Sequence, residues 1–328
     1  MAGKKFAPRN RTVRLSPDEE KTLLQSSLYP SGKMWTVDEV KCRTICGDIF
    51  QTAPLLPRQF ADLIIADPPY NLTKSFNGKV FNRKSFSEYE EYTRTWLSAV
   101  APLLKPDGSI YVCCDWESSL IIGRVLAEFF HVRNRITWER EKGRGAAKNW
   151  KNSLEDIYFA TAGNDYTFNL EAVKVRRRVI APYRSGDGTP KDWRSVGGEK
   201  FRDSCPGNFW NDITVPFWSM PENTDHPTQK PEKLLAKLIL ASSCSGAMVF
   251  DPFGGSGSTA VTAKKLDRNY CSVEIDQGYC ACTVKRLLMA DADRSIQGFS
   301  DGVFWERNSF PGKNPRKSGD TPAEADER

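Results

Sequence analysis

The chain has 328 residues, of which 27% are charged and 11% aromatic, and its formal net charge is +6. This length exceeds that of a usual single domain. The fraction of charged residues is that of an ordinary globular protein, and together with nine tryptophans it excludes a generally disordered chain. No apolar run approaches the roughly 20 residues that span a bilayer and no secretory leader pattern is present, so we expect a cytoplasmic protein without membrane contact.

The two ends of the chain differ from its centre. Residues 1–40 begin with five Lys or Arg and no acidic residue in the first fifteen, and weak hydrophobic periodicity there predicts a mobile basic arm. Residues 307–328 are rich in Pro, Gly and charged side chains and have almost nothing to bury. A disordered tail is therefore predicted at this end.

Between these ends, short apolar runs alternate with helical patterns. The runs that predict buried strands are 61–66, 109–115, 132–138, 156–160, 248–250 and 271–275. Helical patterns lie at 86–104, 118–130, 231–242 and 258–266. This alternation predicts an α/β fold with a mostly parallel sheet and helices on both faces. We assign its two halves to residues 41–163 and 226–306.

The first of these strands leads into Asp67-Pro68-Pro69-Tyr70, at the kind of strand end where open α/β sheets place their chemistry. Two successive prolines remove two N–H donors and leave a stiff turn that presents carbonyl oxygens. An amino group on a heterocyclic base is a poor nucleophile, and acceptors in line with its N–H bonds favour the transition state of its methylation. Asp67 and the Pro68 carbonyl can supply these acceptors, and Tyr70 can stack on the base. The alternative is a rigid surface turn.

Residues 164–225 break the α/β rhythm and predict an insertion. Residues 131–202 hold sixteen Lys or Arg against nine Asp or Glu, a local excess that predicts contact with phosphate. A solvated surface is the alternative for each single charge. The candidate contacts with DNA are Arg140, Lys142, Arg144, Lys148, Arg176, Arg177, Arg178, Arg184 and Arg194.

A Gly-rich turn at 251–259 joins a predicted strand to a predicted helix. Its glycines let the backbone approach a ligand closely, and the helix N-terminus offers N–H groups to an oxygen-bearing group. Glu274 ends the next strand, where its carboxylate can accept both hydroxyls of a ribose. Such a turn is also compatible with dinucleotide binding or with a tight connection alone. No Walker lysine follows it, and two lone histidines without a CxxC pair predict no metal site.

The tetrapeptide and the Gly-rich turn together resemble the amino-methyltransferase family of DNA-modifying enzymes, whose signatures are a (D/N/S)PP(Y/F/W) loop and a DxFxGSG-like turn. The loop precedes the turn by about 180 residues, an order similar to the beta group, in which the Rossmann-like methyltransferase sheet is circularly permuted. His226-Pro227-Thr228-Gln229-Lys230-Pro231 also matches that group. The resemblance covers residues 42–290 and implies S-adenosylmethionine as cofactor.

The same resemblance implies roles for individual residues. The segment 152–155 is similar to one that closes over a flipped base, although Ser153 stands where a His is common. Asp in the first position of the loop goes mainly with adenine N6 and Ser with cytosine N4, so adenine N6 is expected. The implied cofactor contacts are Asp251, Phe253, Gly255, Ser256 and Gly257 in the turn, Glu274 at the ribose, Thr228 and Lys230 at the methionine end and Asp48 at the adenine.

The expected function is site-specific methylation of adenine N6 in double-stranded DNA, with the target base flipped out and the insertion reading the sequence. For Trp210 we favour packing of the insertion against the core, and for His226 a positioning role. The alternatives are cytosine-N4 or RNA adenine methylation, a non-catalytic nucleic-acid-binding module and, more distantly, a nicotinamide oxidoreductase. The resemblance also suggests a prokaryotic or phage protein, a homodimer and a companion restriction endonuclease.

Overall fold

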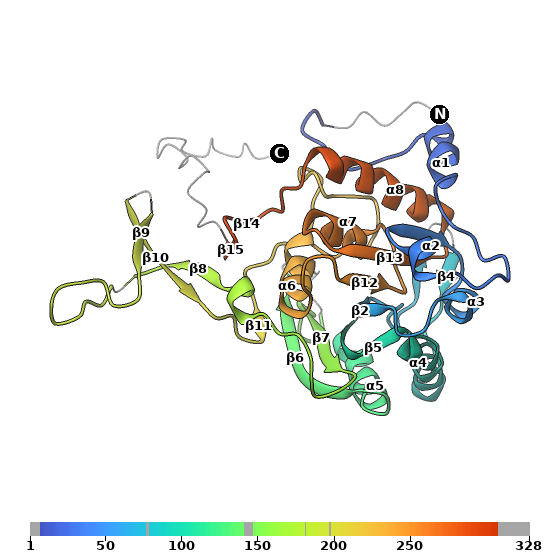
Figure 1. Cartoon of the computed structure of the whole chain (residues 1–328), viewed down its shortest axis with the longest axis horizontal. Coiled ribbons are helices and arrows are strands. Elements are labelled where there is room, and N and C mark those ends of the chain that lie inside the picture. The colour runs from blue at the N-terminus through green and yellow to red at the C-terminus, as the bar shows by residue number, and fades with distance from the viewer. Residues whose placement is uncertain (1–6, 77–78, 141–146, 181, 197, 308–328) are drawn as a thin grey trace.

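The computed structural model describes residues 7–76, 79–140, 147–180, 182–196 and 198–307 (Figure 1). Its centre is an eight-stranded sheet in the order β1-β13-β12-β2-β5-β7-β6-β11. Five of its strand pairs are parallel, and only β5 with β7 and β7 with β6 are antiparallel. The strands are β1 (Arg43–Cys46), β2 (Ala61–Ala66), β5 (Leu104–Cys114), β6 (His131–Glu139), β7 (Leu154–Thr161), β11 (Phe209–Trp210), β12 (Met248–Asp251) and β13 (Asn269–Glu274).

Helices cover both faces of this sheet, as predicted. Alternation along β2 shows why, because Leu63 and Ile65 belong to one buried cluster while Ile64 and Ala66 belong to the other. The first cluster is closed by α6, α7 and α8 and the second by α4 and α5. The helices are α4 (Phe86–Val100), α5 (Trp116–Leu126), α6 (Glu232–Ser242), α7 (Ser258–Lys265) and α8 (Gln277–Ala292).

The central strands bring the two sequence signatures together. β12 is parallel to β2, with Val249 opposite Leu63 and Phe250 opposite Ile64, so the carboxyl ends of both strands lie at one edge of the sheet. β13 flanks β12 in parallel on the other side. The loop that follows β2, the Gly-rich turn that follows β12 and Glu274 at the end of β13 therefore share that edge.

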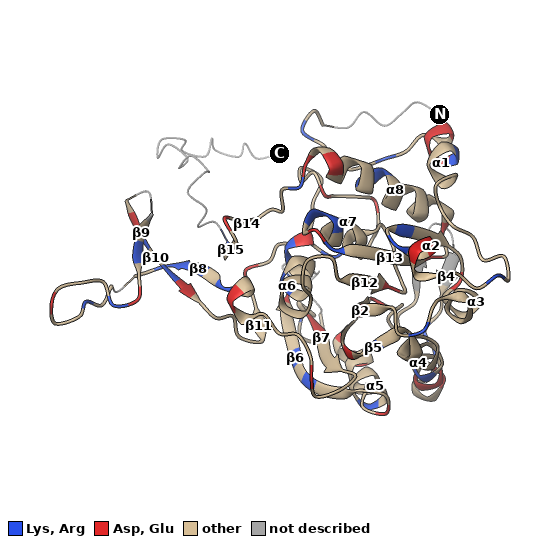
Figure 2. Ribbon diagram, viewed as in Figure 1, with Lys and Arg blue, Asp and Glu red and all other residues tan. Residues whose placement is uncertain are grey.

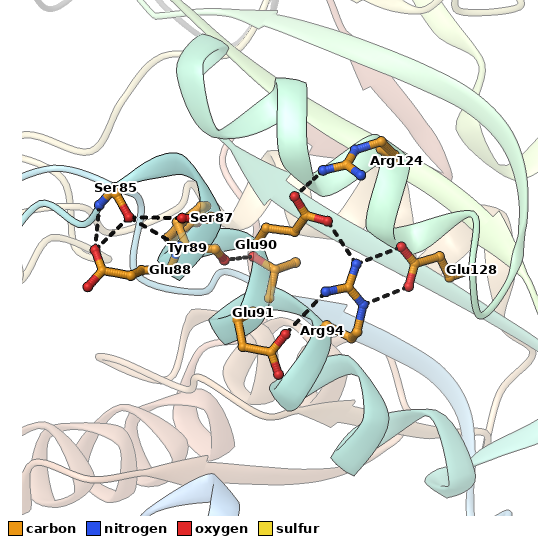
Figure 3. Close-up of polar contacts among 10 residues, drawn as sticks. Ser85, Ser87, Glu88, Tyr89, Glu90, Glu91, Arg94, Arg124 and Glu128 are labelled. Carbon is orange, nitrogen blue, oxygen red and sulfur yellow. Dashed lines mark hydrogen bonds and ion pairs between the residues drawn. The ribbon is translucent and has the colours of Figure 1, made fainter.

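Helix α4 begins in a capping box and is tied to α5 by charged side chains (Figure 3). The Ser85 hydroxyl accepts a hydrogen bond from the Glu88 backbone N–H, and the Glu88 carboxylate accepts one from the Ser85 N–H. Arg94 donates through two nitrogens to Glu128, each over 2.9 Å, and through a third contact of 2.8 Å to Glu90. These pairs add little individually, but together they hold α4, whose Tyr89 bonds to the loop at residues 67–70.

The insertion forms a second sheet that extends away from the body in Figure 1. The predicted insertion, 164–225, supplies β8, β9 and β10, while β11 joins the central sheet instead. The strand β15, from the C-terminal part of the chain, pairs in parallel with β8. Residues 226–306, which we assigned to one half of the central fold, thus also contribute a strand to the second sheet. The strands are β8 (Val175–Arg178), β9 (Arg194–Val196), β10 (Glu199–Ser204), β14 (Phe299–Ser300) and β15 (Val303–Trp305).

The expectation of a free basic arm at 1–40 is wrong for its described part. The Arg11 backbone N–H donates to the Trp218 carbonyl over 2.7 Å, and α1 packs on α8. None of the helices that the structure describes is long and apolar enough to cross a membrane. The predicted tail, apart from residue 307, lies outside the described residues. The shorter elements are α1 (Pro17–Leu24), α2 (Val37–Val40), α3 (Ile49–Thr52), the hairpin β3 (Lys74–Phe76) with β4 (Lys79–Phe81), and the 3-10 turns η1 (Ala53–Leu55), η2 (Ala101–Leu103) and η3 (Leu170–Val173).

Candidate active site

A cavity of about 410 Å³ opens at the carboxyl edge of β1, β2, β12 and β13. Its volume lies in the range of small-molecule and cofactor sites. With one exception, every residue that the sequence assigned to catalysis or to the cofactor lines it. These residues are Asp48, Asp67, Pro68, Pro69, Tyr70, Thr228, Lys230, Asp251, Phe253, Gly255, Ser256 and Glu274.

The exception is Gly257, which serves the packing of the turn. Its φ is +79°, and a Cβ there would lie 2.4 Å from the Thr283 Cγ2 on α8. Only a residue without a side chain fits this left-handed position so close to the neighbouring helix. Gly257 therefore lets α7 begin directly against α8, and it does not face the cavity.

The Gly-rich turn is anchored by two carboxylates, the buried Asp251 and the half-buried Glu274. Glu274 accepts the backbone N–H of Gly255 over 2.7 Å and that of Asp276 over 2.8 Å, and burial raises its pKa. Asp251 accepts the Phe253 N–H over 2.9 Å, and burial raises the pKa of Asp251 to about 7. Both acids shape the turn before any ligand arrives, which lowers the entropy lost on binding.

The lining fits S-adenosylmethionine. At Gly255 a Cβ would approach the His226 ring within 3.1 Å, so the bare backbone leaves room that a side chain would fill. Glu274 places a carboxylate where ribose hydroxyls can donate, and Phe253 adds an apolar wall. Asp48, the N-cap of α3, accepts the Phe50 N–H over 2.8 Å and also faces the cavity. A cavity with hydroxyl acceptors beside apolar surface suits a nucleoside cofactor.

The loop Asp67-Pro68-Pro69-Tyr70, which the sequence predicts to be the catalytic loop, is held by neighbouring side chains. The Tyr89 hydroxyl on α4 donates to the Pro69 carbonyl over 3.0 Å. The buried Asn71 donates its backbone N–H to the Ser118 hydroxyl over 3.1 Å and its side-chain N–H to the Lys84 carbonyl over 3.0 Å. Among the described residues, no hydrogen bond reaches the Pro68 carbonyl oxygen. These bonds hold the loop through Pro69 and Asn71, and the Pro68 carbonyl oxygen can still accept a hydrogen bond from a ligand.

The Asp67 carboxylate has a partner on each oxygen. The Tyr70 hydroxyl donates to Oδ1 over 2.8 Å, and Lys230 Nζ donates to Oδ2 over 2.6 Å. The same ammonium lies 3.0 Å from the Tyr70 hydroxyl and 3.3 Å from Oε2 of Glu155. Burial opposes the charge on Lys230, but the two carboxylates outweigh it and raise its pKa, so the side chain is an ammonium.

Sequence reasoning missed the role of Glu155. This residue lies on β7, is 2% exposed and forms an ion pair with Arg140 through its other oxygen, Oε1. The segment 152–155 was expected near a flipped base, but nothing in the sequence pointed to its acid as a partner of the catalytic loop. The sequence shows only a single Glu at the start of a predicted buried strand, and a buried acid usually has a charged partner.

A family model described as DNA methylase matches residues 61–285 of the chain. The chain belongs to the N6/N4 DNA methylase family. It is 32% identical over 260 residues to the type II methyltransferase M.HpaI of Haemophilus parainfluenzae, covering 78% of this chain and 76% of the relative. It is 33% identical over 257 residues to the DNA adenine methyltransferase YhdJ of Escherichia coli (strain K12), covering 75% and 82%.

Solved structures agree on the fold of this methylase. The PvuII DNA methyltransferase, named as cytosine-N4-specific, superposes with a TM-score of 0.56 at 18% identity and covers 77% of this chain and 88% of its own. The M1.HpyAVI complex with SAM gives 0.51 at 23% identity and covers 74% and 98%. The expected family and the expected methyltransferase fold are both confirmed.

Some of the predicted DNA contacts form ion pairs within the protein, and others are exposed without such a partner. The Arg176 side chain is only 8% exposed and donates to both oxygens of Asp203, over 2.7 and 2.9 Å, so it does not present its charge to DNA. Arg194 shares that same carboxylate, and Arg178 pairs with Glu199. Three of the predicted arginines therefore pair with acids on β10, although the basic residues of the segment still outnumber its acids (Figure 2).

Arg178 and Arg194 are nevertheless exposed. Three further predicted contacts, Arg177, Arg184 and Lys148, are exposed and form no ion pair among the described residues; Arg184 lies over the Trp193 ring at 5.3 Å from its centroid. Arg140 is partly buried in its ion pair with Glu155. Lys142 and Arg144 lie outside the described residues. The available basic surface of the insertion is therefore smaller than its sequence suggested.

Two further expectations concern packing. Trp210 is buried in the cluster below α6, donates to the Gly207 carbonyl over 2.8 Å and lies under the Lys237 ammonium. This confirms its packing role. The His226 ring meets Tyr279 edge-on at 4.5 Å and lies against the Gly255 turn, an arrangement consistent with the expected positioning role.

Proposed function

We propose that this methylase transfers a methyl group from S-adenosylmethionine to N6 of a flipped-out adenine in double-stranded DNA, with Asp67 and Pro68 as acceptors for the amino group. The family and the named adenine relative support this activity. The observation that carries the residue assignment is one cavity that joins the Asp67 loop to the Gly-rich turn.

In this proposal the protein activates the amino group by orientation. Oδ2 of Asp67 and the Pro68 carbonyl accept its two N–H bonds, which favours a pyramidal nitrogen and developing positive charge. Bound S-adenosylmethionine supplies a methyl group activated by a sulfonium. The proton lost from the methylated nitrogen passes to the Asp67 carboxylate or to water, since the aminium is strongly acidic.

The base must first leave the duplex, because an amino group inside it cannot reach a cavity of this kind. Rotation costs a few kcal/mol, which contacts with phosphates help to offset. Arg177, Arg184 and Lys148 remain the proposed phosphate contacts because they are exposed and, among the described residues, are not held in ion pairs. The second sheet, formed by β8, β9, β10, β14 and β15, is the proposed target-recognition region.

Cytosine N4 is the second candidate substrate, because the PvuII enzyme of that specificity shares the fold. The Asp in the first position of the loop favours adenine. A homodimer and a companion restriction endonuclease are further proposals from the family resemblance. Sedimentation of the purified chain and of the chain with its target DNA tests the first of these.

The activity is tested by incubating the protein with tritiated S-adenosylmethionine and unmethylated duplex DNA and then digesting the DNA to nucleosides. Label in N6-methyladenosine is expected, and label only in cytosine or only in an RNA substrate contradicts the proposal. Asp67→Ala should abolish transfer while cofactor binding by calorimetry stays within about threefold. Unchanged turnover in that variant removes Asp67 from the mechanism.

A further inference from the structure

Lys230 occupies the place on Asp67 that the proposed mechanism gives to the target base. Its ammonium donates to Oδ2 of Asp67 over 2.6 Å, while Oδ1 is bonded to Tyr70. An ammonium has three donors, and here the three point at Asp67, Glu155 and the Tyr70 hydroxyl. Lys230 thus makes the contact on Oδ2 that the N–H bond of a base amino group would make.

Charge makes the two occupants incompatible during the reaction. Lys230 is 6% exposed, so its ammonium acts on its surroundings with little screening by water. An ammonium on Oδ2 neutralises the Asp67 carboxylate and would lie close to the amino nitrogen as that nitrogen becomes positive. Both effects oppose the transition state. The ammonium must therefore leave Oδ2 before methyl transfer.

Glu155 offers the ammonium another partner without moving the lysine out of the site. Its Oε2 already lies 3.3 Å from Nζ, and its other oxygen is held by Arg140. A buried ammonium left without a partner would be strongly destabilising, so an acid within reach is required for the exchange. Glu155 is 2% exposed and has that charge in place.

We propose that Lys230 is a placeholder for the target amino group: it neutralises Asp67 in the free enzyme and shifts to Glu155 when the flipped base enters. The shift is a rotation of the ammonium, with no bond or proton transferred. This inference rests on the proposed function. It makes Lys230 and Glu155 positioning residues that control when the Asp67 carboxylate is available, in place of the contact with the cofactor's methionine end that the resemblance implied for Lys230.

A double-variant experiment tests the exchange. Glu155→Gln keeps the shape but removes the alternative charge, so Lys230 stays on Asp67, and we expect the single-turnover rate to fall at least tenfold. Adding Lys230→Met removes the obstacle, so the double variant should recover most of that rate. A double variant as slow as Glu155→Gln, or slower, would overturn the proposal.

Two measurements besides activity complete the test. With 2-aminopurine next to the target adenine, fluorescence should report less flipped adenine in Glu155→Gln than in wild type, and more in Lys230→Met. Calorimetry should give affinities for S-adenosylmethionine within about threefold of wild type in both variants. A tenfold loss in Lys230→Met would instead assign Lys230 to the cofactor and overturn the exchange.

Controls separate this inference from the proposed function. Lys264→Met removes an ion pair with Asp291 far from the loop in sequence and should change neither rate nor fluorescence. Lys230→Gln replaces Lys230→Met if the latter does not fold, as judged by its melting temperature. If wild type itself places no label in DNA adenine, the proposed function is contradicted. The exchange is contradicted separately, by the rates, fluorescence and affinities of the variants relative to wild type.

Discussion

The Tyr70 hydroxyl donates a hydrogen bond to Oδ1 of Asp67 over 2.8 Å, so the ring and the acid of the catalytic loop are held as one unit. Burial, followed by the charge of Asp67, raises the pKa of Tyr70, and the phenol therefore remains a donor at neutral pH. The bond orients the carboxylate, and the ring itself lies under the Lys230 ammonium, 5.3 Å from its centroid.

The two roles of Tyr70 can be separated by substitution. Tyr70→Phe keeps the ring and loses the bond to Asp67, and since a hydrogen bond to a charged group contributes about 1.5–3 kcal/mol, we expect kcat to fall roughly 10-fold to 100-fold. Tyr70→Ala loses the stacking surface as well and should lower kcat further and raise the KM for DNA. Equal kinetics in the two variants would mean that the ring does not stack on the base.

Glu274 is predicted to be the acid that binds the ribose. Glu274→Gln weakens an acceptor for two backbone N–H groups and for the cofactor hydroxyls, so the affinity for S-adenosylmethionine should fall about tenfold by calorimetry. Asp276→Asn is the matched control, because Asn retains the N-cap bond that Asp276 accepts from the Tyr279 N–H. A larger loss of affinity in Asp276→Asn than in Glu274→Gln would assign ribose binding to Asp276 in place of Glu274.

The sequence predicted much of the central sheet because most of its strands, such as β2 and β12, are buried along nearly their whole length. The strand 61–66 was predicted with its observed bounds, since the apolar run from Leu63 to Ala66 is bounded by Asp-Pro-Pro. β1 was missed because it has only four residues, and its place beside β13 depends on partners more than 220 residues away. The Gly-rich turn and its acid were predictable because their chemistry is local.

The second sheet and the charge network could not be predicted from local sequence. β8 pairs with β15 from the other end of the chain, and no local pattern specifies that register. Arg176 looked like a phosphate contact because its partner, Asp203, comes beside it only through the antiparallel pairing of β8 with β10. Lys230 meets Asp67 across 163 residues, a contact that only the tertiary fold creates.

Adjacent arginines on β8 give a sharp test of the surface assignment. Arg176→Ala removes one partner of a largely buried ion pair and should destabilise the fold by about 3 kcal/mol, which thermal unfolding would show. Arg177→Ala should leave the melting temperature unchanged within about 1 °C, because the side chain is exposed. It should instead weaken DNA binding and lower the slope of log K against log salt by about 1. A salt slope altered only in Arg176→Ala would contradict both assignments.

The stability of the methylase should fall as pH rises towards 8, with Glu222 as one cause. Its carboxylate accepts the Glu232 backbone N–H over 2.7 Å. Burial, and then the charge of Glu232, raise the pKa of Glu222 to about 7, from an ordinary value of 4.5. The folded protein therefore binds more protons than the unfolded chain between about pH 4.5 and 7, and its free energy of unfolding decreases across that window.

Glu222→Gln should remove this part of the pH dependence, because a glutamine oxygen can still accept the Glu232 N–H and the side chain carries no charge at any pH. At pH 8 the ionised Glu222 lowers the free energy of unfolding by up to about 3 kcal/mol, so the variant should melt several degrees above wild type. At pH 4.5 the two proteins should melt together, since the wild-type carboxyl is then protonated. Asp251, with its pKa also near 7, will leave a residual slope in the variant. A difference in melting temperature that is largest at low pH would contradict the raised pKa of Glu222.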